Sequence, residues 1–369
     1  MLNEILEDYK LPSGLLLKNR VVMAPMSTLS AMESGRVSDE ELDFYQLRSD
    51  GPGLIITGST NVSYKGKAYQ HSNSVINDAM VPRLRKFSQV LKNHGSKAIL
   101  QIYHGGAMVP SRLINGQCPV AVSVIEDKAT SVDDWKELTS DEINQIISDF
   151  SNATKRALKA GFDGVEINCA SPYLIEQFLS PYQNQRKDQW GGCLVNRMQF
   201  PLKVIEACIE AGKSSDHPFA VGVRLSIPSK QSQSISLKDT MRFIERLSHE
   251  PIDYIHYSYG KAKGTIEMMG KETSIPEAIK SVLKNQIPII ACGSIQTMNE
   301  AIEVLEEVPL FSMGRELVIE PKWTKKIMDE RPEEIKRTIS RKGRLTSKIP
   351  RRLWTTILDS PEWFHFEDS

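Results

Sequence analysis

The chain has 369 residues, of which 40% are hydrophobic and 25% charged, an ordinary globular composition that excludes a collagen-like or disordered protein. Its 46 Lys and Arg residues balance its 46 Asp and Glu residues, so the formal net charge is zero. A protein whose main partner is nucleic acid is expected to be basic, so this balance predicts no nucleic-acid partner. The five cysteines form no Cys-x-x-Cys pair, which predicts neither a structural zinc nor a cysteine-bound iron–sulfur cluster and indicates a reducing compartment.

The N-terminus and the distribution of apolar residues argue against export and membrane insertion. The first residues, MLNEILEDYK, lack the basic start and the apolar run of a signal peptide. No stretch of the sequence approaches the ~20 apolar residues that a membrane helix needs. We therefore expect a cytoplasmic protein with no membrane partner.

Eight short apolar runs predict buried strands. Most of them are continuous rather than alternating, which is typical of strands in a parallel sheet whose two faces are both covered. In chain order they span residues 20–26, 53–58, 97–104, 164–168, 219–226, 252–258, 287–293 and 309–314.

Helical patterns lie between these strands, and the clearest spans residues 140–160. Its apolar residues recur every three or four positions, Thr139 and Glu142 form a capping-box pattern, and Gly161 follows as a stop. Other helices are predicted at residues 39–48, 81–94, 195–211, 238–249, 275–283 and 298–305. Strands that alternate with helices indicate βαβ units, and eight such units predict a (β/α)8 TIM barrel, with an open doubly wound sheet as the alternative.

We expect residues 1–330 to form the barrel and residues 331–369 to form a basic helical tail that packs on it or extends from it. The Arg and Lys residues of this tail indicate a solvated terminal helix or, alternatively, a contact between subunits of a homo-oligomer. The segment 105–134 is long, polar and without periodicity, so we expect it to cover one end of the barrel.

The C-terminal ends of the barrel strands carry the active sites of this fold. In this sequence they carry small and polar side chains with few carboxylates, and they form neither a His-rich metal set nor a Ser/His/Asp set. Such a mouth suits an uncharged heterocycle better than a hydrolytic reaction. Gly293 and Ser294 follow the seventh strand and Gly314 and Arg315 the eighth, which is the usual place of a phosphate in this fold.

Several stretches of the chain match one known family. They are LKNRVVMAPM (17–26), GPGLIITGST (51–60), LQIYHGG (100–106), GFDGVEI (161–167), YLIEQFLSP (173–181), NQRKDQWGG (184–192), VGVRLS (221–226) and MGREL (313–317). By these motifs the chain resembles the old yellow enzyme family of flavin-dependent ene-reductases, from Leu17 to about Trp323. The resemblance implies a single barrel and one tightly but noncovalently bound FMN.

The resemblance also implies roles for residues at the strand ends. Ser59 would lie near a ring carbonyl of FMN, Gln101 at the pyrimidine edge, and Arg224 at the N1/C2 carbonyl end, where a cation stabilises reduced flavin. One side of the ring system would be lined by Ala24, Pro25, Met26 and Ser27, and the phosphate would be held by Gly293, Ser294, Gly314 and Arg315. The alternative for Arg224 is an internal ion pair.

The chain departs from the family just after the fourth strand. The family has His-x-x-Asn or His-x-x-His there, a pair that binds the electron-withdrawing group of the substrate, whereas this chain has Asn168 and Ser171. Both side chains are neutral hydrogen-bond donors, so we expect weaker activation or a different substrate. Tyr173 keeps the family's position, and the resemblance makes its phenol the proton donor, with a packed aromatic ring as the alternative.

We therefore expect an FMN-dependent oxidoreductase, in which NADH or NADPH supplies hydride and a small electron-poor molecule, such as an activated alkene, accepts it. Because the usual His is missing, a nitro compound, a quinone or dioxygen is the alternative acceptor. The alternative from another class is a flavin-binding sensor or binding module with little turnover. We expect His104 and His256 to be packing residues, and Cys169 to be buried rather than reactive.

Overall fold

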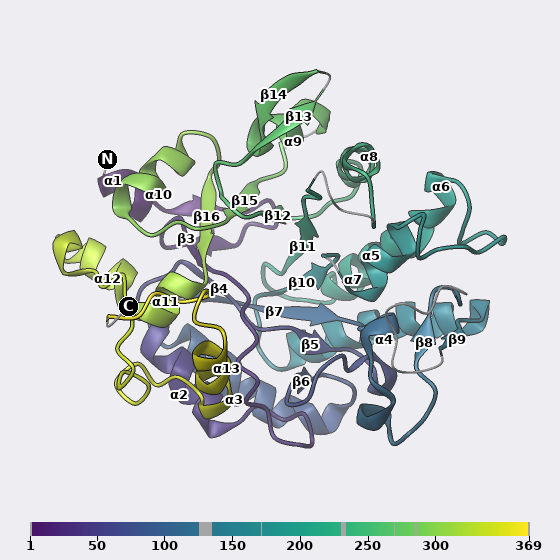
Figure 1. Ribbon diagram of the computed structural model, residues 1–369, viewed down its shortest axis with the longest axis horizontal. Coiled ribbons are helices and arrows are strands. Elements are labelled where there is room, and N and C mark those ends of the chain that lie inside the picture. The colour runs from purple at the N-terminus through teal and green to yellow at the C-terminus, as the bar shows by residue number, and fades with distance from the viewer. Residues whose placement is uncertain are drawn as a thin grey trace.

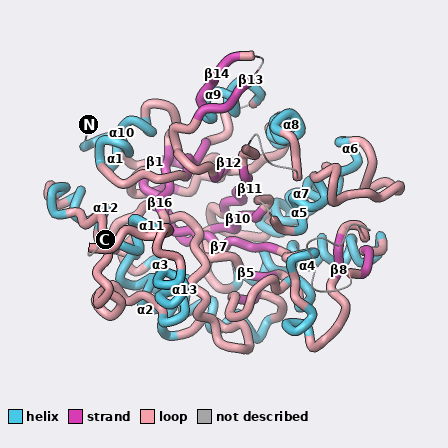
Figure 2. The backbone as a smooth tube through the Cα atoms, viewed as in Figure 1, coloured by secondary structure: helices cyan, strands magenta, loops and turns pink. Residues whose placement is uncertain are grey.

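The protein is built around a closed barrel of eight parallel strands, in a computed structural model that describes residues 2–124, 135–170, 172–229, 234–268, 270–284 and 286–367. The strands follow one another around the barrel in chain order, and helices surround them (Figures 1 and 2). They are β3 (Val21–Met23), β4 (Leu54–Ile56), β7 (Lys97–Tyr103), β10 (Gly164–Asn168), β11 (Ala220–Ser226), β12 (Tyr254–Ser258), β15 (Ile289–Cys292) and β16 (Leu310–Met313). The predicted (β/α)8 barrel is confirmed, because β16 pairs with β3 and β7 pairs with β10 to close the sheet.

The longer helices lie in the sequence between these strands. They are α2 (Asp39–Arg48), α3 (Val81–Lys92), α4 (Ser140–Lys159), α7 (Gln199–Gly212), α8 (Leu237–Leu247), α9 (Ile275–Val282) and α10 (Met298–Leu305). The capping box predicted before α4 is present: the Glu142 N–H donates to Thr139 Oγ1 over 3.2 Å, and the Thr139 N–H donates to Glu142 Oε2 over 3.0 Å.

The single helix predicted over residues 195–211 is wrong, because a short helix α6 (Leu194–Arg197) ends before α7 begins. Pro201 explains the break, since it has no N–H with which to continue the helical hydrogen bonding to the carbonyl of Arg197.

Shorter elements connect and decorate the barrel. They are α1 (Leu2–Leu6), β1 (Tyr9–Lys10), β2 (Leu16–Leu17), β5 (Thr60–Asn61), β6 (Asn73–Ser74), β8 (Val120–Ala121), β9 (Lys136–Glu137), α5 (Leu174–Leu179), β13 (Thr265–Met268), β14 (Lys271–Ser274), α11 (Arg315–Ile319), α12 (Trp323–Met328), α13 (Arg351–Asp359) and the 3₁₀ helices Tyr64–Gly66, Asp78–Met80, Gly106–Met108, Ser111–Ile114 and Pro332–Glu334. The antiparallel hairpin β13–β14 projects beyond the barrel (Figure 1). Residues 125–134, part of the segment expected to cover one barrel end, lie outside the described residues.

The barrel strands divide their side chains between two apolar clusters. In β15, Ile290 belongs to a cluster inside the barrel, whereas its neighbours Ile289 and Ala291 belong to the larger cluster between the strands and the helices. The inner cluster also contains Leu11 and Leu15 from the β1–β2 hairpin, which lies at the N-terminal end of the barrel. That end is therefore filled with apolar side chains, and polar groups gather at the other end.

The C-terminal residues pack on the barrel through α13, which lies beside α2 (Figure 1). Leu353 and Ile357 are fully buried, and the Arg351 N–H donates to Glu40 Oε2 over 3.2 Å. Among the described residues, no helix combines the length and the apolar composition that a membrane crossing needs.

Candidate active site

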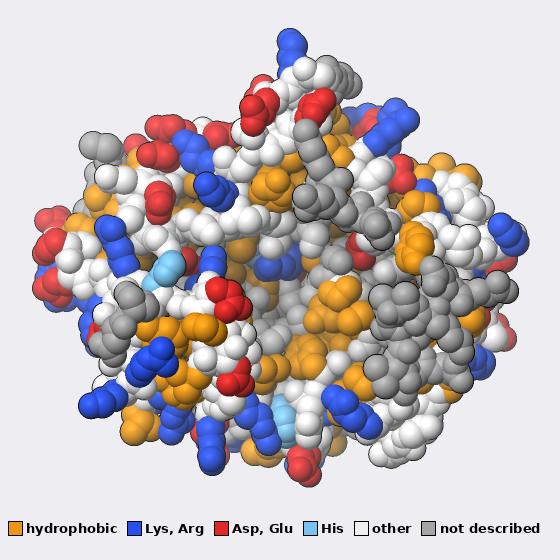
Figure 3. All heavy atoms as spheres, in the orientation of Figure 1, with side chains coloured by type: hydrophobic (Ala, Val, Ile, Leu, Met, Phe, Trp, Pro, Cys, Tyr) orange, Lys and Arg blue, Asp and Glu red, His pale blue; other side chains and the backbone are white. Residues whose placement is uncertain are grey.

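The C-terminal ends of the barrel strands carry a group of polar side chains that hydrogen-bond to one another. The space-filling view shows a hollow over β10 and β11, in which hydrophobic and basic side chains are visible (Figure 3).

Gln101 on β7 lies at the centre of the polar group. Its Oε1 accepts a hydrogen bond from Ser59 Oγ over 2.5 Å, and its Nε2 donates to Glu166 Oε1 over 2.7 Å. Gln101 is only 2% exposed and Ser59 8%. The structure thus brings together two residues that the sequence proposed for the cofactor site, and adds Glu166 as a partner that the sequence did not indicate.

Asn168 at the end of β10 belongs to the same group. Its Nδ2 is 3.3 Å from both Ser59 Oγ and Gln101 Oε1, and its Oδ1 accepts from the Ala170 N–H over 3.0 Å. Ser59 Oγ and Gln101 Oε1 are themselves only 2.5 Å apart, so they lie in the same direction from Nδ2 and share one hydrogen of this amide. Ser171, its expected partner, lies outside the described residues.

Tyr69 joins the first strand end to the second. Its hydroxyl donates to the Ser59 carbonyl over 3.1 Å, so it accepts from Ser27 Oγ, which lies 2.7 Å away. Burial raises the pKa of Tyr69 well above its ordinary value. Sequence reasoning missed this residue, because it lies in an irregular segment with no periodic pattern.

Tyr173 lies against the ring of Tyr103 at the mouth. Its ring centroid is 4.7 Å from that of Tyr103, which in turn stacks on Tyr69 at 5.9 Å. Burial raises the pKa of Tyr173, so its phenol stays protonated at neutral pH. A partly exposed, protonated phenol is what a proton donor requires, and the aromatic packing holds its ring in place.

Arg224 on β11 is the cation of this mouth. In the sheet register it lies opposite Asn168 on one side and His256 on the other. Its Nη1 is shielded from solvent and has no hydrogen-bond partner among the described residues. The guanidinium thus keeps one donor for a ligand, while its charge also lowers the pKa of the Glu166 carboxyl on the neighbouring strand.

A buried ion pair lies beside Arg224 in the barrel. His256 Nδ1 donates to Glu166 Oε2 over 2.8 Å, its Nε2 donates to Ser312 Oγ over 2.9 Å, and the His256 and Glu166 side chains are fully buried. Burial works to lower the pKa of His256, but the Glu166 carboxylate raises it overall. Burial likewise works to raise the pKa of the Cys292 thiol, but His256 and the charge of Arg224 lower it to about 7.

The residues proposed for phosphate binding meet at the ends of β15 and β16. Arg315 Nη2 donates to Ser294 Oγ over 3.1 Å, and its Nη1 lies 3.4 Å from the Trp363 carbonyl. Gly293 has a φ of +154°, and a Cβ there would lie 2.5 Å from the Tyr259 carbonyl, so only glycine fits.

The first turn of α10 is capped within the protein. Glu300 Oε2 accepts from the N–H groups of Gln296 and Thr297, over 2.8 and 2.9 Å. The Glu300 N–H in turn donates to Thr297 Oγ1 over 3.2 Å, which completes a capping box at the start of this helix.

The residues expected along one side of the ring system follow β3. Ala24 is buried and its N–H donates to the Met313 carbonyl over 2.9 Å, which fixes the end of β3 against β16. Pro25 and Met26 are partly exposed. A Cβ at Gly314 would lie 2.8 Å from Met26 Sδ, so the bare backbone of Gly314 leaves room for the methionine.

The remaining candidates are buried as expected. His104 is 2% exposed, burial lowers its pKa to about 3, and its Nδ1 accepts from the Gly106 N–H over 3.1 Å. Cys169 is also 2% exposed, and burial raises the pKa of its thiol well above the ordinary value. Neither group presents chemistry to a ligand in the mouth.

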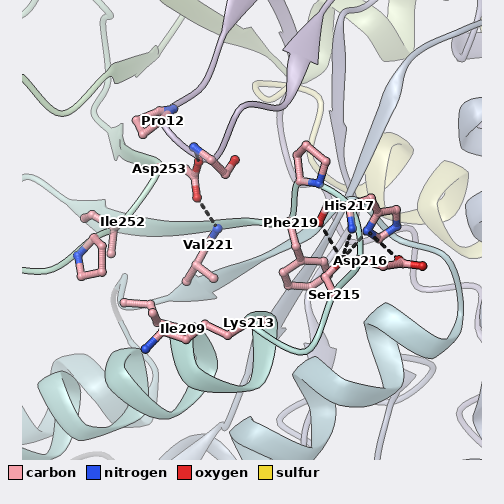
Figure 4. Close-up of a pocket in the computed structure, with 14 residues that line it drawn as sticks. Pro12, Ile209, Lys213, Ser215, Asp216, His217, Phe219, Val221, Ile252 and Asp253 are labelled. Atoms are coloured by element: carbon pink, nitrogen blue, oxygen red, sulfur yellow. Dashed lines mark hydrogen bonds and ion pairs between the residues drawn. The ribbon is translucent and has the colours of Figure 1, made fainter.

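A cavity of about 600 Å³ lies at the opposite end of the barrel, around the segments that lead into β11 and β12 (Figure 4). In it Asp253 Oδ2 accepts from the Val221 N–H over 2.8 Å, and Oδ1 accepts from the Ser13 N–H over 2.8 Å. None of the proposed site residues lines this cavity.

The mouth of the barrel fits a flavin nucleotide. A donor of Arg224 lies unpaired and shielded from solvent at one strand end, and Ser294 with Arg315 offers polar contacts at another. Between them the wall combines amide and hydroxyl groups with the apolar side chain of Met26. A flat, largely uncharged ring system that carries one anionic group matches this set of donors.

Comparisons with known proteins agree with this geometry. The chain is 34% identical over 369 residues to a probable NADH-dependent flavin oxidoreductase of Bacillus subtilis, covering 99% of this chain and 98% of the relative. It is 35% identical to an NADH:fumarate oxidoreductase of Klebsiella pneumoniae over 95% of this chain, but spans only 38% of that longer protein. The structure of an old yellow enzyme homologue from Zymomonas mobilis superposes with a TM-score of 0.77 at 26% identity, covering 89% of this chain and 93% of that one.

A family model describes most of the chain. The model of the NADH:flavin oxidoreductase / NADH oxidase family matches residues 10–334. The chain therefore belongs to this family, that of the old yellow enzymes, and is an oxidoreductase that uses FMN with NADH or NADPH.

Proposed function

We propose that this protein transfers hydride from NADH or NADPH, through FMN, to a small electron-poor molecule such as an activated alkene. The observation that carries the proposal is the unpaired, shielded Nη1 of Arg224 at the mouth, with the protonated phenol of Tyr173 on the neighbouring strand connection. Bound FMN supplies the hydride chemistry; the chain supplies charge stabilisation, orientation and a proton.

In this proposal each side chain has a defined task. Arg224 stabilises negative charge that develops at the pyrimidine end of the bound group, because its donor has no competing partner in the protein. Tyr173 delivers the proton from its phenol oxygen, while Tyr103, on which Tyr69 stacks, packs against its ring. Asn168, with Ser171, takes the place of the family's substrate-binding pair.

The proposed phosphate contacts are those at the last two strand ends. Arg315 and Ser294 would share the anion, and Gly293 and Gly314 would let the backbone approach it. Ala24, Pro25, Met26 and Ser27 would form the wall behind the ring system, with Ser59 and Gln101 along its polar edge.

The choice of acceptor depends on Asn168. Because its amide is neutral and one of its hydrogens is already shared by Ser59 and Gln101, it offers a weaker electrophilic contact than a charged imidazole would. This favours, as the second candidate, acceptors that are already strongly electron-poor, such as quinones and nitro compounds. The fumarate relative suggests that unsaturated acids should be tested beside them.

The test separates the two half-reactions. The purified holoprotein is reduced anaerobically with NADH or with NADPH, and reoxidation of the flavin is then followed after addition of cyclohexenone, fumarate, a nitroalkene or a quinone. We expect rapid bleaching by one of the two nucleotides and reoxidation by at least one acceptor. A holoprotein that neither nucleotide bleaches would support the binding-module alternative instead.

Tyr173→Phe provides the matched control for the proton donor. It keeps the ring and removes only the hydroxyl, so it should slow reoxidation by alkenes, which need a proton on carbon, and leave reoxidation by quinones nearly unchanged. If alkenes reoxidise Tyr173→Phe as fast as they reoxidise wild type, the phenol of Tyr173 is not the proton donor.

A further inference from the structure

The ion pair between Glu166 and His256 is placed where it can control the polar edge of the site. Both side chains are fully buried. Glu166 is hydrogen-bonded to Gln101 on the adjacent strand β7, and His256 is hydrogen-bonded to Ser312 on β16. Burial works to raise the pKa of Glu166, but the charge and hydrogen bond of His256, together with Arg224, lower it overall. The carboxyl is therefore ionised at neutral pH.

An ionised carboxylate can only accept hydrogen bonds. Gln101 must consequently present its amide nitrogen to Glu166, and the 2.7 Å distance between Nε2 and Oε1 agrees with this orientation. The amide oxygen of Gln101 is then turned the other way, where it accepts from Ser59 Oγ and Asn168 Nδ2. With a neutral partner in place of Glu166, either orientation of the amide would satisfy the contact.

We propose that Glu166, held by His256, is a positioning residue that fixes the Gln101 amide with its oxygen toward the ligand, so that the site selects a hydrogen-bond donor at this point. The inference rests on the proposed function, in which Gln101 contacts the pyrimidine edge of FMN. That edge carries the N3–H donor between two carbonyl acceptors, so the orientation of the amide decides which of them is recognised.

The network also shows which contact a ligand donor would replace. The bond from Ser59 to Gln101 Oε1 is 2.5 Å long, whereas the contact from Asn168 Nδ2 is 3.3 Å long. The longer one is the weaker of the two. A ligand N–H at Gln101 Oε1 would replace this contact, and the Asn168 hydrogen would keep Ser59 Oγ as its acceptor. Through Gln101, Glu166 thus affects both the cofactor edge and the substrate donor.

The experiment compares FMN with its N3-methylated analogue, which lacks the N3–H. Apoprotein is titrated with each flavin, and quenching of flavin fluorescence gives the two dissociation constants. For wild type we expect FMN to bind more tightly, and for Glu166→Gln we expect this preference to fall by about threefold to tenfold, the value of one neutral hydrogen bond. General damage to the fold would weaken both flavins together and leave their ratio unchanged.

Ser312→Ala is the matched control. It removes a buried hydrogen bond to His256 in the same network without touching the contact between Glu166 and Gln101, so the preference should stay at the wild-type value. Loss of the preference in Ser312→Ala as well as in Glu166→Gln would show that it reports core packing, and would overturn the inference.

A measurement on wild type decides the matter if Glu166→Gln does not fold. An acceptor at N3–H stabilises the protonated flavin, so the alkaline absorbance titration of bound FMN should lie at higher pH in wild type than in Gln101→Leu, in which the charge of Arg224 still acts on the flavin. A wild-type titration point equal to or below that of Gln101→Leu would overturn the inference while leaving FMN binding intact. A wild-type protein that binds no FMN would instead refute the proposed function, and this inference with it.

Discussion

Removing the charge of Arg224 should lower the reduction potential of the bound flavin. The charge of Arg224 acts on three nearby groups: it works to lower the pKa of Glu166, His256 and the Cys292 thiol, although the Glu166 carboxylate raises the pKa of His256 overall. Its Nη1 has no hydrogen-bond partner among the described residues, so this donor can meet negative charge on a ligand. Negative charge that builds up nearby on reduction is stabilised by the same field.

The size of the effect follows from Coulomb's law. Two unit charges about 4 Å apart interact by ~4 kcal/mol at an effective dielectric constant of about 20. For a two-electron couple ~1.4 kcal/mol corresponds to ~30 mV, so the full interaction is worth ~90 mV. Solvent screens Arg224, which is partly exposed, and the nearby Glu166 carboxylate offsets part of its charge. We therefore expect between half and all of the full interaction, so the reduction potential of Arg224→Ala should be ~40–90 mV lower than that of wild type.

The assay is an anaerobic spectrophotometric titration of wild type, Arg224→Ala and Arg224→Lys against a reference dye, with flavin content measured on each sample. Arg224→Lys is the matched control, since it keeps the charge and should recover most of the potential. Reduction by NADH or NADPH should slow in parallel with the loss of potential. An Arg224→Ala protein that keeps its FMN and has the wild-type potential would show that the guanidinium acts only structurally.

Four further predictions test other parts of the molecule. Arg315→Ala should weaken FMN binding by about tenfold to a hundredfold, the value of a charge-assisted contact, and unchanged affinity by fluorescence titration would remove Arg315 from the site. Burial raises the pKa of Glu41 from 4.5 to about 7, so its contribution to stability is complete below about pH 4.5 and is lost as the pH rises through 7. Denaturant titrations of wild type should therefore show a decrease of ~3 kcal/mol in unfolding free energy over this pH range, and Glu41→Gln, which cannot ionise, should lack this decrease. The same pH profile in Glu41→Gln and wild type would contradict the assignment. Leu353→Ala should cost ~2–5 kcal/mol in unfolding free energy because its side chain is fully buried where α13 packs on the barrel, and a cost near zero would mean that this packing adds nothing to stability. Asn168→His combined with Ser171→Asn should speed reoxidation by cyclohexenone about tenfold, as part of the value of an oxyanion donor, while reduction by NADH or NADPH stays nearly constant; no gain with FMN still bound would refute the role given to this pair.

The fold could be predicted because each barrel strand carries its own signal. A strand covered on both faces is apolar at every position, and eight such runs separated by helical patterns allow few architectures. The predicted element that failed, residues 195–211, failed for a local reason: its apolar spacing continues through Pro201, but the backbone hydrogen bonding does not. The hairpin β13–β14 carries no comparable signal, since its strands expose most of their side chains.

The site was only partly predictable, because its hydrogen bonds join residues that are far apart in sequence. Gln101 and Ser59 come from strand ends that the barrel rule selects, and the structure places them in contact. Glu166 and His256 lie inside apolar runs, where a single charged or polar residue carries no sign of whether it faces the barrel interior or the helices. Whether such a side chain points into the barrel depends on strand tilt and register. In this protein Glu166 and His256 also bond to each other, although they are 90 residues apart in sequence.

Asn168 is where the departure from the family has its clearest physical consequence. An imidazole at this position can carry a positive charge and direct it at a substrate oxygen, whereas an amide is neutral and has both an acceptor and donors to satisfy. In this protein the Asn168 amide oxygen is bonded to the Ala170 N–H, and one amide hydrogen is shared by Gln101 and Ser59. These contacts tie the side chain to the cofactor edge of the pocket before any substrate arrives. A substrate oxygen can then receive at most a neutral hydrogen bond from this amide, so it must be reactive without a charged partner, and this makes the comparison of enones with quinones the most informative part of the acceptor panel.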